Sequence, residues 1–191
     1  MALRTPIGIL SFPNLFVARA AVQGGEPRFS LNLIFDDAAL KTPEYQALRA
    51  AVAEAIDAEW GAGKSKDTKF VQGLRLPFRK TSEKEYAGYD KGTIFVHAWS
   101  KQKPGVVDAQ KQDILVPDDV WAGQLARATV RPFAYQQSGN KGVSFALENV
   151  QIAKKDMPRL DGRQSANAAF DELPTEGGKS AGAPAGDDAP F

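Results

Sequence analysis

Residues 126–152 read ARATVRPFAYQQSGNKGVSFALENVQI, and this stretch decides the fold. Two runs rich in β-branched and aromatic residues, 126–136 and 143–152, flank a segment at 137–142 that contains Ser, Gly, Asn and Lys. Gly and Asn tolerate the backbone angles of a tight turn. The stretch therefore predicts an antiparallel hairpin of two long strands.

Three further runs predict strands outside this hairpin, at residues 8–22, 29–35 and 93–100. In 29–35 the apolar residues occupy alternate positions and are separated by Ser and Asn, which is the two-residue period of a strand with one buried face. Together with the hairpin they make five strands, so we expect a mainly β domain.

A single helix is expected at residues 43–59, with Thr42 as its N-cap. Its apolar stripe consists of Leu48, Val52, Ala55 and Ile56. The connection at 61–92 is charged, rich in glycine and longer than a plain turn, so we expect it to be either functional or loose. One helix among five strands with a long middle loop predicts a small closed or half-closed barrel.

The net charge of +1 is unevenly distributed. Residues 164–191 carry five acids and one base, net −4, whereas residues 1–163 carry 23 bases and 18 acids, net +5. Aliphatic β-formers almost vanish after residue 158. We therefore expect one folded domain over residues 1–158 and a disordered acidic tail over residues 159–191. A basic body permits a polyanionic partner but does not require one.

Composition excludes several classes of protein. Cysteine is absent, which excludes disulfides, thiolate nucleophiles and cysteine-ligated metals. No run of about 18 apolar residues occurs, so we expect neither a membrane span nor an export signal. No cofactor is expected.

Three features suggest enzyme chemistry, and each has a more ordinary interpretation. Gly61–Ser65 (GAGKS) resembles a phosphate-binding loop, but Ala58 replaces the first glycine of that motif and the segment follows a helix instead of a strand. Asp36–Asp37 and Asp118–Asp119 could bind magnesium, but their positions favour capping of turns. His97 is the only histidine and has no metal-binding partner. We expect a protein that is not an enzyme, with a metal-dependent nuclease and a protein-interaction module as the alternatives.

Binding of single-stranded nucleic acid needs cations along the phosphates and aromatic faces for unpaired bases. Residues 75–103 interleave both. On the predicted strand in this stretch, Phe95, His97 and Trp99 point to one side and small aliphatic residues to the other. This alternation predicts an aromatic surface opposite the core.

The hairpin repeats the arrangement, because Arg131, Phe133 and Tyr135 share one face of the first strand. The residues that we predict to contact DNA are Arg79, Lys80, Lys84, Tyr86, Tyr89, Lys91, Trp99, Lys101, Arg131, Tyr135 and Lys141. The alternative is that the rings are core residues and the lysines ordinary solvated charges.

The last residues place an aromatic ring and a free carboxylate at the end of an acidic arm. A partner with a basic pocket beside a hydrophobic slot would bind such a peptide. The residues that we predict to contact the partner are Asp187, Asp188, Pro190 and Phe191.

The sequence DDAPF at 187–191 resembles the acidic tip of bacterial single-stranded-DNA-binding proteins, with Ala189 in place of a larger aliphatic residue. Residues 5–19 and 129–153 resemble a family of phage-encoded OB-fold single-stranded-DNA-binding proteins found in tailed phages, and the likeness spans about residues 1–160.

The resemblance implies a five-stranded OB barrel with an inserted helix, and a role in phage DNA replication or recombination in the cytoplasm of the infected bacterial host. It also implies a tail that recruits replication proteins such as a polymerase, helicase or primase and that occupies the DNA groove when DNA is absent. It assigns no individual DNA contact. The oligomeric state, a homodimer included, and the length of the binding site stay open.

Overall fold

The computed structural model describes residues 2–20, 23–137, 139–163 and 169. The strands in these residues are β1 (Leu3–Arg4), β2 (Gly8–Arg19), β3 (Arg28–Phe35), β4 (Phe78–Lys80), β5 (Ile94–Ser100), β6 (Gly105–Val107), β7 (Leu125–Gln137) and β8 (Asn140–Lys154). The helices are α1 (Pro43–Trp60) and α2 (Thr68–Gln72), and short 3-10 turns lie at Ala39–Lys41, Lys64–Lys66, Thr81–Glu83, Tyr89–Lys91 and Pro117–Asp119.

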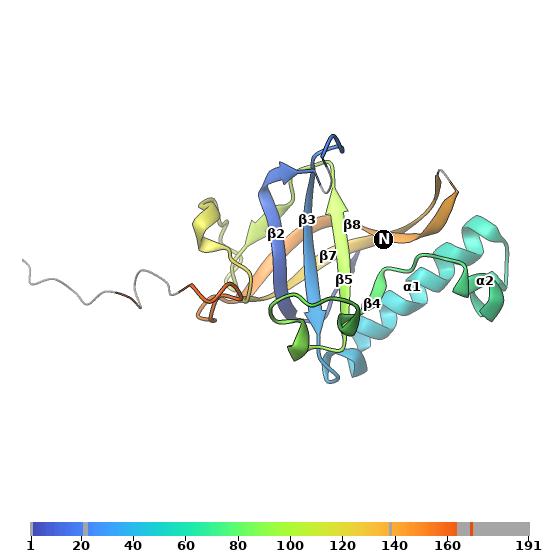
Figure 1. Ribbon diagram of the computed structural model, residues 1–191, viewed down its shortest axis with the longest axis horizontal. Helices are drawn as coiled ribbons and strands as arrows, with labels where there is room; N and C mark the ends of the chain where they lie inside the picture. The colour runs from blue at the N-terminus through green and yellow to red at the C-terminus, as the bar shows by residue number, and fades with distance from the viewer. Residues whose placement is uncertain (1, 21–22, 138, 164–168, 170–191) are drawn as a thin grey trace, which may run out of the picture.

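The five long strands close into a ring. Antiparallel pairing joins β2 to β3, β3 to β5, β7 to β8 and β7 to β2, and parallel pairing of β5 with β8 completes the circle. The far ends of β7 and β8 extend beyond the ring as a projecting hairpin (Figure 1). The five strands expected from the sequence are these five. The short strands β1, β4 and β6 were not predicted and pair with β7, β5 and β8.

Alternation along each strand separates the inside of the ring from its outside. In β3, Leu31 and Leu33 are buried in the main core, whereas Asn32 between them lies on the outer face. In β5, Val96 and Ala98 are buried in the same core. The predicted assignment of inner and outer faces on these two strands is confirmed.

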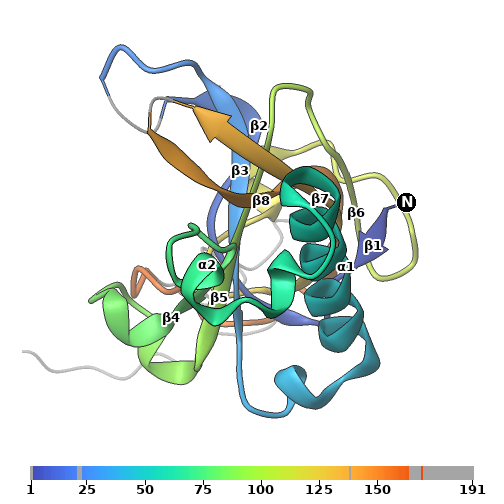
Figure 2. The ribbon, with the colours of Figure 1, turned by 90° about the vertical axis from the view of Figure 1, so that its right-hand side faces the viewer.

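Helix α1 covers β7 and β8 (Figure 2). The Thr42 hydroxyl accepts a hydrogen bond from the Tyr45 backbone N–H at 3.3 Å, which caps the first turn. Of the predicted stripe, Leu48, Val52 and Ile56 are buried and Ala55 is half-buried, and Tyr45 joins them as a buried residue that was not predicted. The helix ends at Trp60, one residue later than expected.

The connection at residues 61–92 is folded against the barrel. Strand β4 pairs with β5, and Arg75 forms an isolated bridge with the projecting hairpin. The Arg75 N–H donates to the Lys141 carbonyl, and the Val143 N–H donates to the Arg75 carbonyl, both at 3.0 Å. Gly142 permits this approach, since a Cβ there would lie 2.1 Å from the Arg75 carbonyl oxygen.

Candidate nucleic-acid interface

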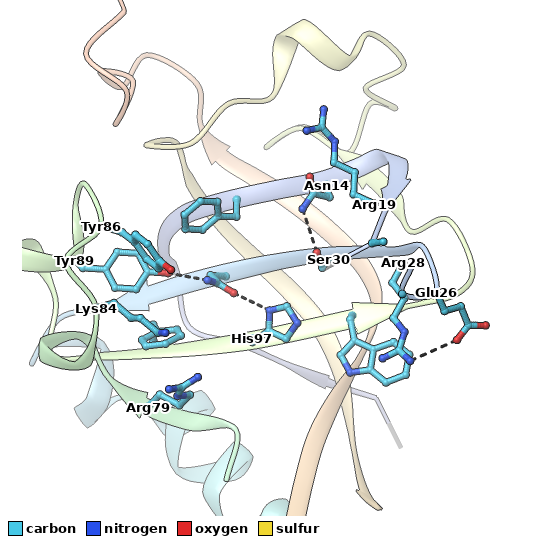
Figure 3. Close-up of a pocket in the computed structure, with 16 residues that line it drawn as sticks. Asn14, Arg19, Glu26, Arg28, Ser30, Arg79, Lys84, Tyr86, Tyr89 and His97 are labelled. Carbon is cyan, nitrogen blue, oxygen red and sulfur yellow. Dashed lines mark hydrogen bonds and ion pairs between the residues drawn. The ribbon is translucent and has the colours of Figure 1, made fainter. Parts of the chain in front are cut away.

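A groove of about 720 Å³ lies on the outer face of β2, β3 and β5 (Figure 3). Its floor comes from the outward-facing residues of these strands, and β4 and the loop after it form one side. A small apolar cluster of Ile34, Tyr89 and Phe95, separate from the main core, packs on this outer face, and its Tyr89 and Phe95 line the groove. The groove is therefore built on rigid sheet and not on loops alone.

Four aromatic rings stack edge to face at one end of the groove. Ring centroids are 5.2 Å apart for Phe12 and Tyr86, 5.5 Å for Tyr86 and Tyr89, and 5.1 Å for Tyr89 and Phe95. Phe12 and Tyr86 are 49% and 48% exposed, whereas Tyr89 and Phe95 are 2% and 3% exposed. Two buried rings thus support two exposed rings that are free to stack with a ligand. Phe12 has a φ of 47°, an uncommon value for a residue with a Cβ.

Trp99 lies at the other end of the groove. The Arg28 guanidinium stacks on its ring at 3.8 Å from the centroid, and the Phe133 ring meets it edge-on at 5.6 Å. The indole N–H donates to the Ser144 hydroxyl at 3.2 Å, which fixes the plane of the ring. Arg28 is paired with Glu26 at 3.4 Å. Because the guanidinium already covers the ring, a flat base could stack at this end on the guanidinium or displace it from Trp99.

Hydrogen-bonding side chains line the floor between the two aromatic ends. The Asn32 amide donates to the Tyr89 hydroxyl at 2.7 Å, and its oxygen lies 2.8 Å from Nδ1 of His97. Asn14 donates to the Ser30 hydroxyl at 3.3 Å. Figure 3 shows Asn14, Ser30 and His97 between Tyr86 and Tyr89 on one side and Arg28 on the other.

The pKa of His97 lies below its ordinary value of 6.5. The main cause is desolvation by the surrounding protein, and repulsion by the cations of Arg79 and Arg28 adds to it. His97 is therefore neutral at pH 7. Burial raises the pKa of Tyr89, so its phenol stays protonated.

The charged side chains around the groove are mainly cations. Arg19, Arg28, Arg79 and Lys84 line it, with Glu26 as the one carboxylate among the described lining residues. The Arg79 guanidinium is 5.5 Å from the Phe95 centroid, and the Lys84 ammonium is 5.8 Å from the Tyr86 centroid. Rings and cations alternate around the groove, which suits bases and phosphates in turn.

Five of the eleven predicted DNA-contacting residues line this groove. They are Arg79, Lys84, Tyr86, Tyr89 and Trp99. Lys101 lies beside it and pairs with Glu26 at 2.7 Å. Lys80 and Lys91 are exposed on β4 and on the 3-10 turn Tyr89–Lys91 and do not line the groove.

The remaining predicted residues lie on β7 and β8, with Arg131 within the ring and Tyr135 and Lys141 on the projecting hairpin. Arg131 pairs with Glu148, and Tyr135 shares its face of β7 with Phe133, the neighbour of Trp99. Lys141 pairs in register with Gln136 on the opposite face, where its ammonium lies 4.5 Å from the Phe70 centroid of α2. The structure therefore does not bring Lys141 to the groove.

Sequence reasoning missed the contribution of β2 and β3. Phe12, Asn14, Arg28 and Asn32 line the groove, and none of them was predicted as a contact. The alternation in 29–35 already placed Asn32 on the outer face. Its pairing with His97 in β5 is the missing step, because it brings the two outer faces together.

Two of the features that suggested enzyme chemistry, the Gly61–Ser65 segment and the Asp36–Asp37 pair, have structural roles. The Asp57 carboxylate accepts hydrogen bonds from the backbone N–H and the hydroxyl of Ser65, at 2.7 and 2.9 Å, and so occupies donors that a phosphate would need. Asp36 caps the N–H of Ala39 at 2.8 Å, and Asp37 accepts from Thr93 at 2.6 Å. Asp118 and Asp119 lie in the 3-10 turn Pro117–Asp119, which has no side-chain cap, so the capping expected of this pair is not seen there.

Other predicted features are outside this site. The described residues contain no group of three or more potential metal ligands. None of the helices described is long and apolar enough to span a bilayer. The predicted partner contacts Asp187, Asp188, Pro190 and Phe191 lie outside the described residues.

Known structures share this fold. The chain is similar to a single-stranded DNA-binding protein from bacteriophage Enc34 solved in complex with ssDNA, with a TM-score of 0.65 and 16% identity over 81% of this chain and 87% of that one. It is also similar to gp2.5, a single-stranded DNA binding protein encoded by bacteriophage T7, with a TM-score of 0.55 and 13% identity over 95% of this chain and 99% of that one.

No curated protein matches the sequence. A protein family does match, over residues 7–179, and its description is Enterobacter phage Enc34, ssDNA-binding protein. The ring of strands with one main helix is the OB-like arrangement of these phage proteins. The match covers most of the sequence, and the chain therefore belongs to the Enc34 phage family of ssDNA-binding proteins.

Proposed function

We propose that this chain binds single-stranded DNA without sequence preference and that the bases stack in the groove of Figure 3. The observation that carries the proposal is the pair of aromatic ends, Phe12 with Tyr86 and Trp99 with Arg28, in a groove bordered by cations. Family membership supports it, since the family is one of ssDNA-binding proteins and not of enzymes.

Each end of the groove has a distinct role in this proposal. One base stacks on Phe12 or Tyr86, another stacks at the end formed by Trp99 and Arg28, and the phosphates near the Tyr86 end contact Arg79 and Lys84. Lys80, Lys91, Lys101 and the hairpin residues Arg131, Tyr135 and Lys141 then guide the backbone on either side. Each stacked base contributes about 1–3 kcal/mol.

The test is a fluorescence titration of the full chain with oligo-dT at two salt concentrations. Affinity should fall steeply with salt because phosphate contacts release counterions. Trp99→Ala should weaken binding by about 1–3 kcal/mol because one stacking platform is removed.

The matched control is Trp60→Ala. Trp60 packs on Phe70 at 5.7 Å and does not line the groove, so its removal should leave the affinity unchanged. Equal effects of the two substitutions, or binding that is insensitive to salt, would contradict the proposal.

We further propose the predicted division of labour between body and tail. The tip of the acidic C-terminal arm recruits replication proteins, a polymerase, helicase or primase, during phage DNA replication or recombination in the cytoplasm of the infected host. Deletion of residues 187–191 should weaken recruitment and leave DNA binding equal or tighter, measured by pull-down and by oligo-dT titration. Loss of DNA binding on deletion would contradict this role.

No observation on the described residues favours a metal-dependent nuclease or a barrel that binds only protein. Magnesium-dependent cleavage of oligo-dT would support the nuclease. A gel-shift assay in which no polyanion, oligo-dT included, changes migration would support the barrel that binds only protein.

A further inference from the structure

A second concavity of about 810 Å³ lies between α2 and β4, next to the groove. Its charged lining residues are Lys66, Arg75, Arg79 and Glu83, which makes three cations against one carboxylate. Lys66 and Arg75 are exposed, and among the described side chains neither is in an ion pair. The second concavity therefore carries two cations that form no ion pair with a described side chain, although Lys66 is near enough to Asp57 to help lower the pKa of that carboxyl.

Arg79 joins the second concavity to the groove, because it lines both. It stands on β4 opposite Phe95, with its guanidinium over the Phe95 ring on one side and 3.0 Å from a Glu83 oxygen on the other. In Figure 3 Arg79 lies at the margin of the groove, apart from Arg28 and Glu26 at the far end. A DNA strand that leaves the groove past Arg79 would enter the second concavity directly.

The lining of the second concavity suits phosphates and not bases. Its one aromatic residue is Phe78, which packs against Tyr45 at 5.4 Å and Phe145 at 5.7 Å and so belongs to the core. The backbone of Arg75 is fixed, since its N–H and its carbonyl both bond to the hairpin. A cation that extends from this backbone with no aromatic ring beside it would contact phosphates and would not read bases.

We propose that the bound strand continues past Arg79 into the second concavity, where Lys66 and Arg75 contact its phosphates without base stacking. This inference rests on the proposed function of the groove. If the DNA continues in this way, the binding site covers more nucleotides than the groove alone, and the additional nucleotides are bound by electrostatic contacts to their phosphates.

The experiment measures affinity of the full chain for oligo-dT of increasing length, from about 4 to about 16 nucleotides and beyond. The variant Lys66→Glu with Arg75→Glu should bind the shortest effective oligonucleotide as the wild type does and the longest roughly tenfold more weakly. Its plot of log affinity against log salt should be shallower by about 0.7 for each phosphate that the variant no longer neutralises.

Lys111→Glu with Lys154→Glu is the matched control. Both residues are exposed, neither lines the groove or the second concavity, and the change in net charge is the same. This control should bind the longest oligonucleotide within about twofold of wild type. Glu83→Gln, which removes the one carboxylate among the described lining residues, should tighten binding of the longest oligonucleotide.

The outcomes separate the two proposals. Failure of the wild type to bind oligo-dT of any length overturns the proposed function. Normal binding by the wild type with equal weakening in the Lys66–Arg75 variant and in the control, or with no weakening at all, overturns the continuation of the strand. Weaker binding at every length, in a variant with the wild-type melting temperature, would place both cations at the groove and also overturns it.

Discussion

His97 is the single histidine of the chain, so a change in DNA affinity near neutral pH can be assigned to it. In the free protein its pKa is below 6.5, because of desolvation and because of Arg79 and Arg28. Phosphates in the groove would raise that pKa, and binding would then take up a proton. We expect the affinity for oligo-dT to increase as the pH falls below 6.5, measured by titration at several pH values.

The control is His97→Gln, which keeps a polar partner for Asn32 but has no charge to gain. Its affinity should not change in this pH window. In the absence of DNA, lower pH destabilises the folded protein. The unfolded chain protonates His97 at its ordinary pKa whereas the folded chain does not, so the free energy of unfolding decreases as the pH falls below 6.5. The same pH dependence of binding in both proteins would contradict the assignment.

At the scale of elements, the hairpin of β7 and β8 positions the segment that carries Arg75. A Cβ on Gly142 would lie 2.1 Å from the Arg75 carbonyl oxygen, so Gly142→Ala must push the two backbones apart and weaken two hydrogen bonds. We expect the free energy of unfolding to fall by about 1–3 kcal/mol, measured by chemical denaturation.

Gly73→Ala is the matched control for this prediction. The nearest atom to a Cβ there is the Phe70 carbonyl oxygen at 3.4 Å, and the φ of −83° suits any residue. Its stability should be close to that of the wild type. Similar stability of the two variants would show that the bridge between Arg75 and the hairpin contributes little.

The elements were predictable where a period repeats several times. Alternation over seven or more residues identified β3, β5 and the hairpin, and the apolar stripe with Thr42 identified α1. Strands β1, β4 and β6 have two or three residues each, too few to show any period.

The groove was predictable only in part, for a related reason. Local alternation placed Phe95, His97 and Trp99 on one face, and three of the predicted contacts that line the groove lie in the loop before β5. It could not show that Asn32 pairs with His97 or that Arg28 stacks on Trp99, since those depend on which strands are neighbours. The position of Lys141 was missed for the same reason, because its pairing with Gln136 places it on the face of the hairpin opposite Tyr135.

At the scale of the whole molecule, the first residues after the barrel pack on it. The Leu160 N–H donates to the Ala122 carbonyl at 2.9 Å, and the Arg159 guanidinium is 4.9 Å from the Trp121 centroid. The Leu160 side chain also lies against Gly88, where a Cβ would be 2.5 Å from it. These contacts favour a folded unit that continues to about residue 163 and not only to residue 158.

We therefore expect a chain that ends at residue 163 to melt at the temperature of the full chain. A chain that ends at residue 158 should be less stable by about 2 kcal/mol, because it lacks one hydrogen bond and one partly buried leucine. Thermal unfolding of the two truncated chains is the measurement, and equal melting temperatures would place the boundary at residue 158.

Closure of the ring has a consequence for biosynthesis. Gly8 of β2 pairs with Ala126 of β7, and β5 pairs with β8. Both pairings that close the barrel can therefore form only after β7 and β8 have been synthesised. While the ribosome is still translating β7 and β8, the apolar faces of β2 and β3 lack the core side chains of these two strands, and the edge of β2 that pairs with β7 is open. Such non-local pairing folds in milliseconds to seconds. We expect refolding on that timescale in stopped-flow experiments, and nascent chains stalled before residue 125 should be sensitive to protease until the hairpin emerges.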